Sequence, residues 1–169
     1  MAKSNKTFPN TSALSKLAIA IVCVNSGMVM SEPGLYSISD GNGHADISFE
    51  NKGTDTSITT IDQTGEFGTT EVTIDWETFN VGVNQTVNFE QNAGDVAINN
   101  IGTGGASEIL GKINADGTVF LSNSNGFVFG ANSSINTGAF LATTSSITNH
   151  TADSFELEDT GSTGSITCY

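Results

Sequence analysis

Short runs in which apolar and polar residues alternate follow one another along most of the chain after residue 44. The clearest is Glu71–Trp76, where Val72, Ile74 and Trp76 occupy every second position and so share one face of a strand. Similar runs predict strands at 45–50, 57–61, 86–90 and 95–101, and then at 119–121, 127–129, 134–136, 139–142 and 145–148. No window after residue 35 carries the 3.6-residue period of an amphipathic helix, so the pattern predicts an all-β protein.

The later strands are too short and too closely spaced for an ordinary sandwich, whose strands are longer and whose turns recur every 8–12 residues. Glycines at likely corners separate them, namely Gly117, Gly126, Gly130 and Gly138, where we expect a Cβ to obstruct the turn. Short strands joined by sharp corners suit a coil whose stacked turns bury a common core, as in a parallel β-helix. Spacing alone leaves the β-helix and a sandwich or barrel equally open.

Side chains in the second half of the chain give two further expectations. Phe120, Phe127 and Phe129 are predicted to stack in one region of the core, and Phe129→Ala to cost about 3–5 kcal/mol if that ring is fully buried. Asparagines are expected at the coil corners, where they tolerate left-handed backbone and form stacked amide ladders: Asn99, Asn100, Asn123, Asn125 and Asn136.

The first 31 residues are predicted to be a signal peptide and its flank. Lys3, Lys6 and Lys16 precede the apolar run 17–24, which is too short for a permanent membrane span and is followed by small and polar residues. The alternative is a buried N-terminal strand or short helix. Cys23 is not expected to be a lipoprotein site, because Val22 before it is bulky.

Charge and composition exclude several classes of function. The net charge is −13, all eighteen acids lie from Glu32 onward, and only Lys52 and Lys112 oppose them there, so a nucleic-acid partner is not expected. His44 and His150 are far apart in sequence, and no catalytic or phosphate-binding motif occurs. The acids around Asp40 and at 153–159 do not follow a calcium loop and are interpreted as solvated loops. We therefore expect no catalytic residue, cofactor or metal.

Two segments, 74–91 and 107–144, carry ordered motifs. Trp76 is followed by Phe79-Asn80-Val81-Gly82, and a later turn reads Asn123-Ser124-Asn125-Gly126. Together they resemble the N-terminal secretion domain of filamentous haemagglutinin-type exoproteins, the large passengers of Gram-negative two-partner secretion. Ser124 departs from the proline common in that turn, and Asn100 stands where arginine is common. The resemblance spans about residues 45–148.

This resemblance implies a right-handed parallel β-helix, a single-stranded coil with short capping or extra-helical strands. The domain would occupy 32–169 and continue beyond it in a longer parent. It implies an exported adhesin- or haemagglutinin-like protein at the cell surface, recognised by the periplasmic domains of an outer-membrane two-partner transporter, with host or cell-surface receptors bound by the missing C-terminal region. The residues expected to serve transporter recognition, or only to shape coil corners, are Phe79, Asn80, Asn123, Ser124, Asn125 and Gly126.

Two other classes stay open. A β-helical carbohydrate-active enzyme is one, although known polysaccharide lyases commonly use Arg or Lys as a base, and this chain has no Arg. A passenger fragment of a single-chain autotransporter is the other.

Overall fold

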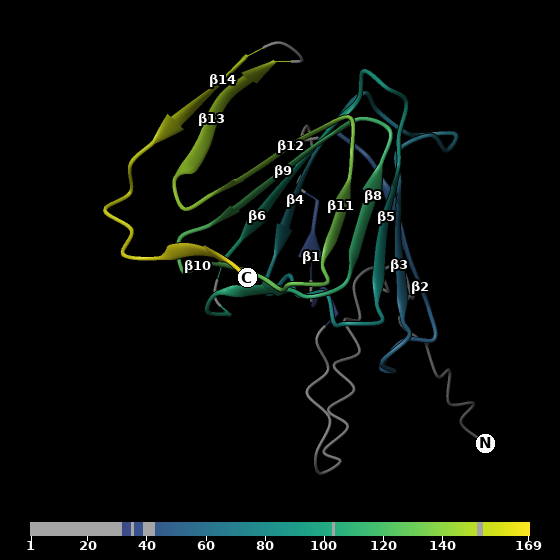
Figure 1. The fold of residues 1–169 in the computed structure, drawn as a ribbon. Coiled ribbons are helices and arrows are strands. Elements are labelled where there is room, and N and C mark those ends of the chain that lie inside the picture. Colours follow the sequence, from purple (N-terminus) through teal and green to yellow (C-terminus); the bar gives the residue numbers. More distant parts are fainter. Residues whose placement is uncertain (1–31, 35, 39–42, 103, 152–153) are drawn as a thin grey trace, which may run out of the picture.

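The structure is a computed structural model that describes residues 32–34, 36–38, 43–102, 104–151 and 154–169. The predicted signal segment 1–31, with Cys23, and the acidic turn at Asp40 therefore lie outside the described residues. Every regular element in the described part is a β-strand, as the alternating pattern predicts (Figure 1). None of its elements is a helix of the length and hydropathy that would cross a bilayer.

Three sheets form the walls of the coil. Sheet A runs in the order β1-β4-β6-β9-β12, sheet B in the order β11-β8-β5-β3-β2, and sheet C in the order β15-β10-β7. Sheet A consists of β1 (Tyr36–Ser37), β4 (Glu71–Trp76), β6 (Val96–Ile101), β9 (Thr118–Asn123) and β12 (Ala139–Thr143). Sheet B consists of β2 (Asp46–Glu50), β3 (Ile58–Asp62), β5 (Thr86–Glu90), β8 (Lys112–Ala115) and β11 (Ser134–Asn136). Sheet C consists of β7 (Ser107–Ile109), β10 (Gly126–Phe129) and β15 (Ser165–Cys168), and a separate hairpin consists of β13 (Ser146–Thr151) and β14 (Ser154–Glu158).

Each turn of the coil visits sheet A, then C, then B, and stacks in parallel on the turn before it. In sheet A, β4 pairs in parallel with β6, and β6 with β9. Sheets B and C repeat this through β5 with β8 and β7 with β10. The first turn is capped by β1 and β2, which pair antiparallel with β4 and β3. The predicted parallel β-helix is confirmed, with about three turns.

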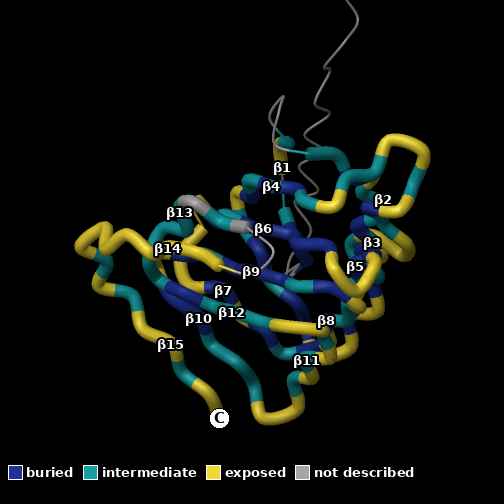
Figure 2. Tube along the Cα trace, turned by 90° about the horizontal axis from the view of Figure 1, so that it is seen from above, coloured by how far each residue is buried: buried dark blue, intermediate teal, exposed yellow. Residues whose placement is uncertain are grey.

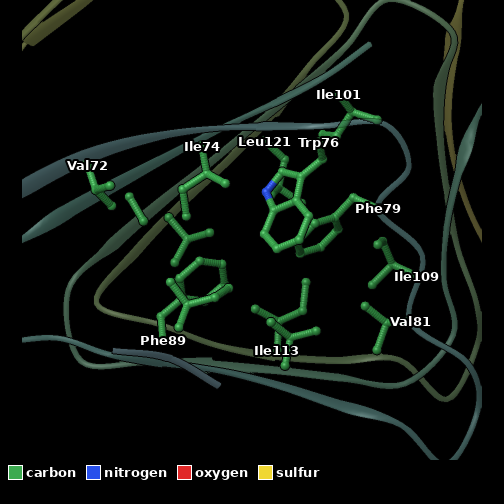
Figure 3. Close-up of a cluster of buried hydrophobic side chains, with 14 of the residues drawn as sticks. Val72, Ile74, Trp76, Phe79, Val81, Phe89, Ile101, Ile109, Ile113 and Leu121 are labelled. Carbon is green, nitrogen blue, oxygen red and sulfur yellow. The ribbon is translucent and has the colours of Figure 1, made fainter. Parts of the chain in front are cut away.

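The inward-facing side chains of all three sheets form one apolar core along the coil axis (Figure 3). The alternation predicted for Glu71–Trp76 is confirmed, because Val72, Ile74 and Trp76 are buried. The same register brings inward residues of successive turns into stacks, such as Val72 on Ala97 and Trp76 on Ile101. These stacks hold the turns together, since each strand contributes only two or three side chains to the core.

The predicted phenylalanine stack is only partly correct. Phe127 is fully buried and stacks on Phe129 at a ring-centroid distance of 6.0 Å, but Phe129 is only partly buried. Phe120 points out of the coil, into a second cluster with Val96 and Ile98. In β9, Val119 and Leu121 occupy the inward positions, so the strand's alternation places Phe120 between them on the opposite face.

That second cluster is covered by the β13–β14 hairpin, which lies outside the coil against sheet A (Figure 2). Ile147 of β13 packs on the cluster, and the ring of Phe155 in β14 contacts Phe120 edge-on at 5.2 Å. Because of this cover, β6 is buried on both faces over Val96–Asn99. The expected strand at 145–148 is therefore part of an extra-helical hairpin and not a wall of the coil.

The predictions for residues at the coil corners are only partly correct. Gly117 confirms the expected obstruction, since a Cβ there would lie 2.5 Å from the Asp95 carbonyl oxygen. Asn99 and Asn100 lie within β6, so the prediction that they occupy corners is wrong, whereas Asn136 ends β11 as Asn123 ends β9. An amide ladder does exist on sheet B, where Asn114 Nδ2 donates to Asn88 Oδ1 at 2.9 Å, with Asn136 next in register.

Candidate functional site

The residues expected to serve recognition lie where sheet A turns into sheet C, a place we call the A–C corner. Successive turns of the coil cross this corner at 76–81, 101–107 and 123–126. Backbone hydrogen bonds link one crossing to the next: the Gly102 amide donates to the Trp76 carbonyl at 2.9 Å, and the Val81 amide to the Glu108 carbonyl at 2.8 Å. The corner is therefore a stack of turns and not a single loop.

Phe79 and Asn80 belong to the first crossing and serve packing and stacking. Phe79 is fully buried, with its ring edge-on to Trp76 at a centroid distance of 5.4 Å. Asn80 is partly exposed, and its Oδ1 accepts a hydrogen bond from the Glu108 amide at 2.9 Å. In the folded domain, Phe79 presents no surface to a partner.

Asn123 is the centre of the third crossing. It is fully buried, and its Nδ2 donates to the Gly105 carbonyl at 2.9 Å and to Ser107 Oγ at 3.0 Å. Its Oδ1 accepts from the Asn125 amide at 2.9 Å, which makes an Asx-type turn. One side chain thus fixes its own turn and ties that turn to the preceding coil.

The rest of that turn is less enclosed. The side chains of Ser124 and Asn125 are exposed, whereas Gly126 is buried with a φ of 99°. A side chain at Gly126 would be strained by that backbone and would also meet the Ser165 carbonyl oxygen at 2.2 Å. Of the six predicted residues, Phe79, Asn123 and Gly126 are inaccessible from outside once the coil has formed.

The structure brings Asn80 of the first crossing and Asn123 of the third crossing to opposite edges of strand β7. Asn80 hydrogen-bonds to Glu108 of β7 from the preceding turn, and Asn123 to Ser107 of β7 from the following turn. Segments more than forty positions apart in the chain therefore meet at β7. An open pocket of 360 Å³ lies beside the corner, and its lining includes Asn100, Ser122, Ser124, Thr144 and Thr160.

A buried polar link next to the corner was missed from sequence. Trp76 Nε1 donates to Asn99 Oδ1 at 2.9 Å, and Asn99 Nδ2 donates to the Phe120 carbonyl at 3.1 Å. Asn99 is fully buried at an inward position, in register with Ile74. The sequence pattern of β6 could have predicted that Asn99 points inward. Ala97, Asn99 and Ile101 occupy every second position and pair in register with the inward residues of β4.

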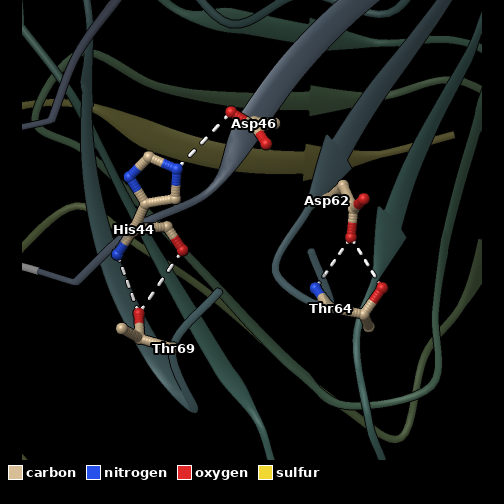
Figure 4. Close-up of polar contacts among 5 residues, drawn as sticks. All are labelled: His44, Asp46, Asp62, Thr64 and Thr69. Carbon is tan, nitrogen blue, oxygen red and sulfur yellow. Dashed lines mark hydrogen bonds and ion pairs between the residues drawn. The ribbon is translucent and has the colours of Figure 1, made fainter. Parts of the chain in front are cut away.

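The titratable groups near the first turn make local contacts (Figure 4). His44 Nε2 lies 3.4 Å from an Asp46 carboxylate oxygen, and the His44 amide donates to Thr69 Oγ1 at 2.8 Å. Hydrogen bonds from the Thr64 hydroxyl and amide, each 2.7 Å long, lower the pKa of Asp62 below its ordinary 3.8. Across the described ranges, no three His, Cys, Asp or Glu side chains are grouped so that they could hold a metal ion.

Comparison with known proteins gives one family and two kinds of relative. The TPS secretion domain family matches residues 37–167. Two curated proteins of Haemophilus influenzae, each named heme/hemopexin-binding protein, are 42% identical over 86 and 78 residues. Those matches cover 50% and 46% of this chain but only 9% and 8% of the relatives, so the chain spans about a tenth of their length.

A solved structure shares the fold. The HMW1 secretion domain from Haemophilus influenzae superposes with a TM-score of 0.62 over 80% of this chain and 35% of that chain, at 23% sequence identity. At this identity the likeness supports the architecture of the coil and not a shared ligand.

Proposed function

Since the chain belongs to the TPS secretion domain family, we propose that an outer-membrane two-partner transporter recognises it through the A–C corner motifs before they fold. The chain is a non-enzymatic secretion domain of a two-partner secreted exoprotein, a class that is secreted or surface-exposed in Gram-negative bacteria.

The burial of Asn123 carries the proposal. The Asn123 side chain has no exposed surface in the folded coil, so a partner cannot contact it there. A partner that recognises Asn123 must therefore bind the chain before the coil has folded. The Asx-type turn at Asn123 spans only two residues, whereas the bonds of Asn123 to Gly105 and Ser107 span 18 and 16 positions. The local turn therefore needs no coil, and a partner can meet it on an extended chain.

Strand pairing to the transporter's periplasmic domains is the proposed mode of contact. An unfolded chain rich in short β-forming segments adds readily to an exposed sheet edge, and backbone hydrogen bonds then supply affinity without demanding one sequence. The turn at Asn123–Gly126 would set the register of that pairing, because β9 ends and β10 begins at this defined point of the chain.

Binding of the urea-unfolded chain, diluted into the purified periplasmic domains, tests the proposal. We expect Asn123→Ala/Asn125→Ala to weaken capture and secretion, while Asn84→Ala/Asn132→Ala, which changes two exposed asparagines outside the corner, leaves both unchanged. Ser107→Ala is the second control, because it removes a folded-state partner of Asn123 and leaves the motif intact. Unchanged capture of the Asn123/Asn125 variant, or an equal loss for Ser107→Ala, would refute a recognition role.

Export to the periplasm is proposed to depend on residues 1–31. This part of the proposal rests on the three lysines and the apolar run 17–24. Replacing Ile19 and Ile21 with Asp should leave the precursor inside the cell, and N-terminal sequencing of the exported protein should locate cleavage between about Ser26 and Ser31. Undiminished export of the double variant would contradict this assignment.

The exoprotein that carries this domain is proposed to be an adhesin whose receptor-binding regions lie beyond it. The printed name of the curated relatives refers to binding of heme/hemopexin, which is consistent with a cargo that binds targets outside the cell. Cell-adhesion assays that compare the whole exoprotein with the secretion domain alone test this proposal. Adhesion by the domain alone, or none by the whole protein, would refute it.

A further inference from the structure

Two neighbouring rows of outward side chains on sheet A differ in polarity. The first row is apolar and lies under the β13–β14 hairpin, and it consists of Ile98, Phe120 and Leu141. Two positions further along the same strands the outward row is polar, and Asn100 pairs in register with Asp75 on one side and Ser122 on the other. The hairpin covers the apolar row, and the open pocket of 360 Å³ lies beside the polar row.

The pocket lies between sheet A and the start of the hairpin. Asn100 and Ser122 line it from the sheet, and Thr144 and Ser146 line it from the segment that leads into the hairpin. The two walls are bonded to each other, because Ser122 Oγ donates to the Ser145 carbonyl at 2.9 Å. The pocket is therefore preformed in the folded domain, as most small-molecule sites are.

The polar groups of the lining are uncharged. Among the described residues that line the pocket, none is acidic or basic, and the hydroxyls come from Ser122, Ser124, Thr144, Ser146 and Thr160. Asn100 Nδ2 donates to Asp75 Oδ1 at 3.0 Å. A carboxylate only accepts, so this bond fixes the orientation of the Asn100 amide and leaves its Oδ1 to accept from a ligand. The pocket thus combines one oriented acceptor with hydroxyls that rotate to donate or accept.

Charge and polarity exclude several classes of ligand. No cation lines the pocket, and eighteen acids oppose only Lys52 and Lys112 from Glu32 onward, so phosphates, sialic acids and uronic acids would be repelled. A wholly apolar ligand would leave the amide and the hydroxyls of the lining without partners. The ligand that fits is neutral and carries several hydroxyl groups.

A sugar ring in the pyranose form has this chemistry. Its hydroxyls donate and accept in several directions, and its C–H face can pack on Ile101 and Ile147, which also line the pocket. A volume of 360 Å³ is at the low end of the range for small-molecule sites, which suits one ring better than a long oligosaccharide.

We propose that this pocket binds one neutral pyranose at the end of a glycan outside the cell. The binding energy per atom that is typical of small ligands gives a Kd of about 1 mM for a single hexose. One site of this affinity does not hold a cell, so the proposal agrees with receptor-binding regions beyond the domain. It does not depend on the transporter, because β6, β9 and the hairpin form the pocket only in the folded coil.

Titration of the isotope-labelled folded domain, followed by NMR of its backbone amides, tests the proposal. The neutral probes are the methyl glycosides of glucose, galactose and mannose, and N-acetylglucosamine. At about 50 mM, which saturates a site of the expected affinity, at least one of them should shift the amides of Asn100, Ser122 and Ser146. Glucuronate should bind at least about tenfold more weakly, and glycerol should show no saturation.

Two variants of the pocket are compared with matched controls. Asn100→Ala removes the oriented acceptor and should weaken binding about fivefold to tenfold, whereas Asn84→Ala, at an exposed asparagine away from the pocket, should leave it unchanged. Gly102→Leu adds a side chain to the lining and should abolish binding. Its control is Gly94→Leu, because nothing lies within 4 Å of a Cβ at Gly94.

Folding of the variants is checked by circular dichroism in urea. A Cβ at Gly102 would lie 3.7 Å from the Trp76 carbonyl oxygen, which is an ordinary contact, so the coil is expected to form. If Gly102→Leu nevertheless fails to fold, Thr144→Val replaces a hydroxyl of the lining by a methyl group of the same shape and should also weaken binding.

Four results would overturn the proposal. The first is the absence of a saturable shift with every neutral probe, and the second is undiminished binding in the folded Asn100→Ala and Gly102→Leu variants. Equal affinity for glucuronate would refute the charge argument, and equal affinity for glycerol would indicate an adventitious additive only. Finally, binding of free hexoses but of no methyl glycoside would show a site for soluble sugars and refute the assignment to a glycan.

Discussion

The buried link between Trp76 and Asn99 supplies the most stringent test of how the coil is held together. Asn99 accepts from the indole of the preceding turn and donates to the Phe120 carbonyl of the following turn, so one amide side chain joins three turns. Replacing Asn99 with Ala removes both bonds and leaves the indole N–H of Trp76 buried without its acceptor. Asn99→Ala is therefore expected to destabilise the domain far more than its small loss of volume suggests.

The magnitude follows from the two kinds of loss. Each of the two lost hydrogen bonds costs about 1 kcal/mol net, and an orphaned buried donor adds about 1–3 kcal/mol, which gives about 3–5 kcal/mol for Asn99→Ala. Trp76→Phe removes the donor together with its need for a partner. The double variant should therefore cost less than the sum of the single variants, by about 1–2 kcal/mol.

Urea unfolding followed by circular dichroism measures these differences, since the domain has a single tryptophan and Trp76→Phe removes the fluorescent probe. Asn100→Ala is the matched control, because Asn100 is the next residue of the same strand and its Nδ2 contacts Asp75 at 3.0 Å in a partly exposed pair. A cost for Asn99→Ala no greater than that of the control, or strict additivity in the double-mutant cycle, would refute the link as a stabilising element.

Three further comparisons of variants test the core, one carboxylate and one corner by the same urea assay. Phe127→Ala should cost about 3–5 kcal/mol and Phe129→Ala about 1–2 kcal/mol, because only the first ring is fully buried; equal costs would contradict this. The hydrogen bonds that lower the pKa of Asp62 stabilise the fold above about pH 4, and this contribution is lost as the pH falls through the lowered pKa. Asp62→Ala should therefore be destabilising at pH 7 and nearly neutral at pH 2, and a pH-independent cost would disprove the assignment. Gly117→Ala should destabilise by at least about 1 kcal/mol, but Gly94→Ala should not, because only the first Cβ meets backbone oxygen; similar effects would rule out the corner argument.

Much of the coil was predictable because parallel turns repeat one simple pattern. In β4 and β5 the period-2 alternation alone identifies the buried face, and the buried positions are those predicted. The outer cluster was not predictable in this way. Phe120 reads as core in a single strand, and only the β13–β14 hairpin, which folds back from a distant part of the chain, gives its outward ring a partner in Phe155.

The site was predictable as a set of residues but not as an arrangement. The motifs identify the crossings at 76–81 and 123–126, but nothing in the local pattern indicates that both meet at β7. That contact depends on the length of the intervening turn. The contact of Ser162 with the Asn123–Gly126 turn was also beyond prediction, because Ser162 lies 38 positions along the chain from Ser124, whose carbonyl its hydroxyl contacts.

The A–C corner combines a local hydrogen bond and long-range hydrogen bonds at the same residue, Asn123. The bond from the Asn125 amide to Asn123 Oδ1 is local and needs no partner turn, whereas the bonds from Asn123 Nδ2 exist only when β7 is in place. A transporter that binds an extended chain can contact only the local turn, whereas the folded coil depends on the bonds from Asn123 Nδ2.

A substitution that keeps the side-chain oxygen of Asn123 but removes its amide donor therefore separates recognition of the turn from stability of the coil. Asn123→Asp should retain the turn and capture by the transporter but lose stability in the folded coil, because a carboxylate would face Ser107 Oγ and the Gly105 carbonyl in a buried site. Loss of capture from the unfolded Asn123→Asp chain would show that the amide itself is read, and would remove the physical basis for assigning recognition to the turn.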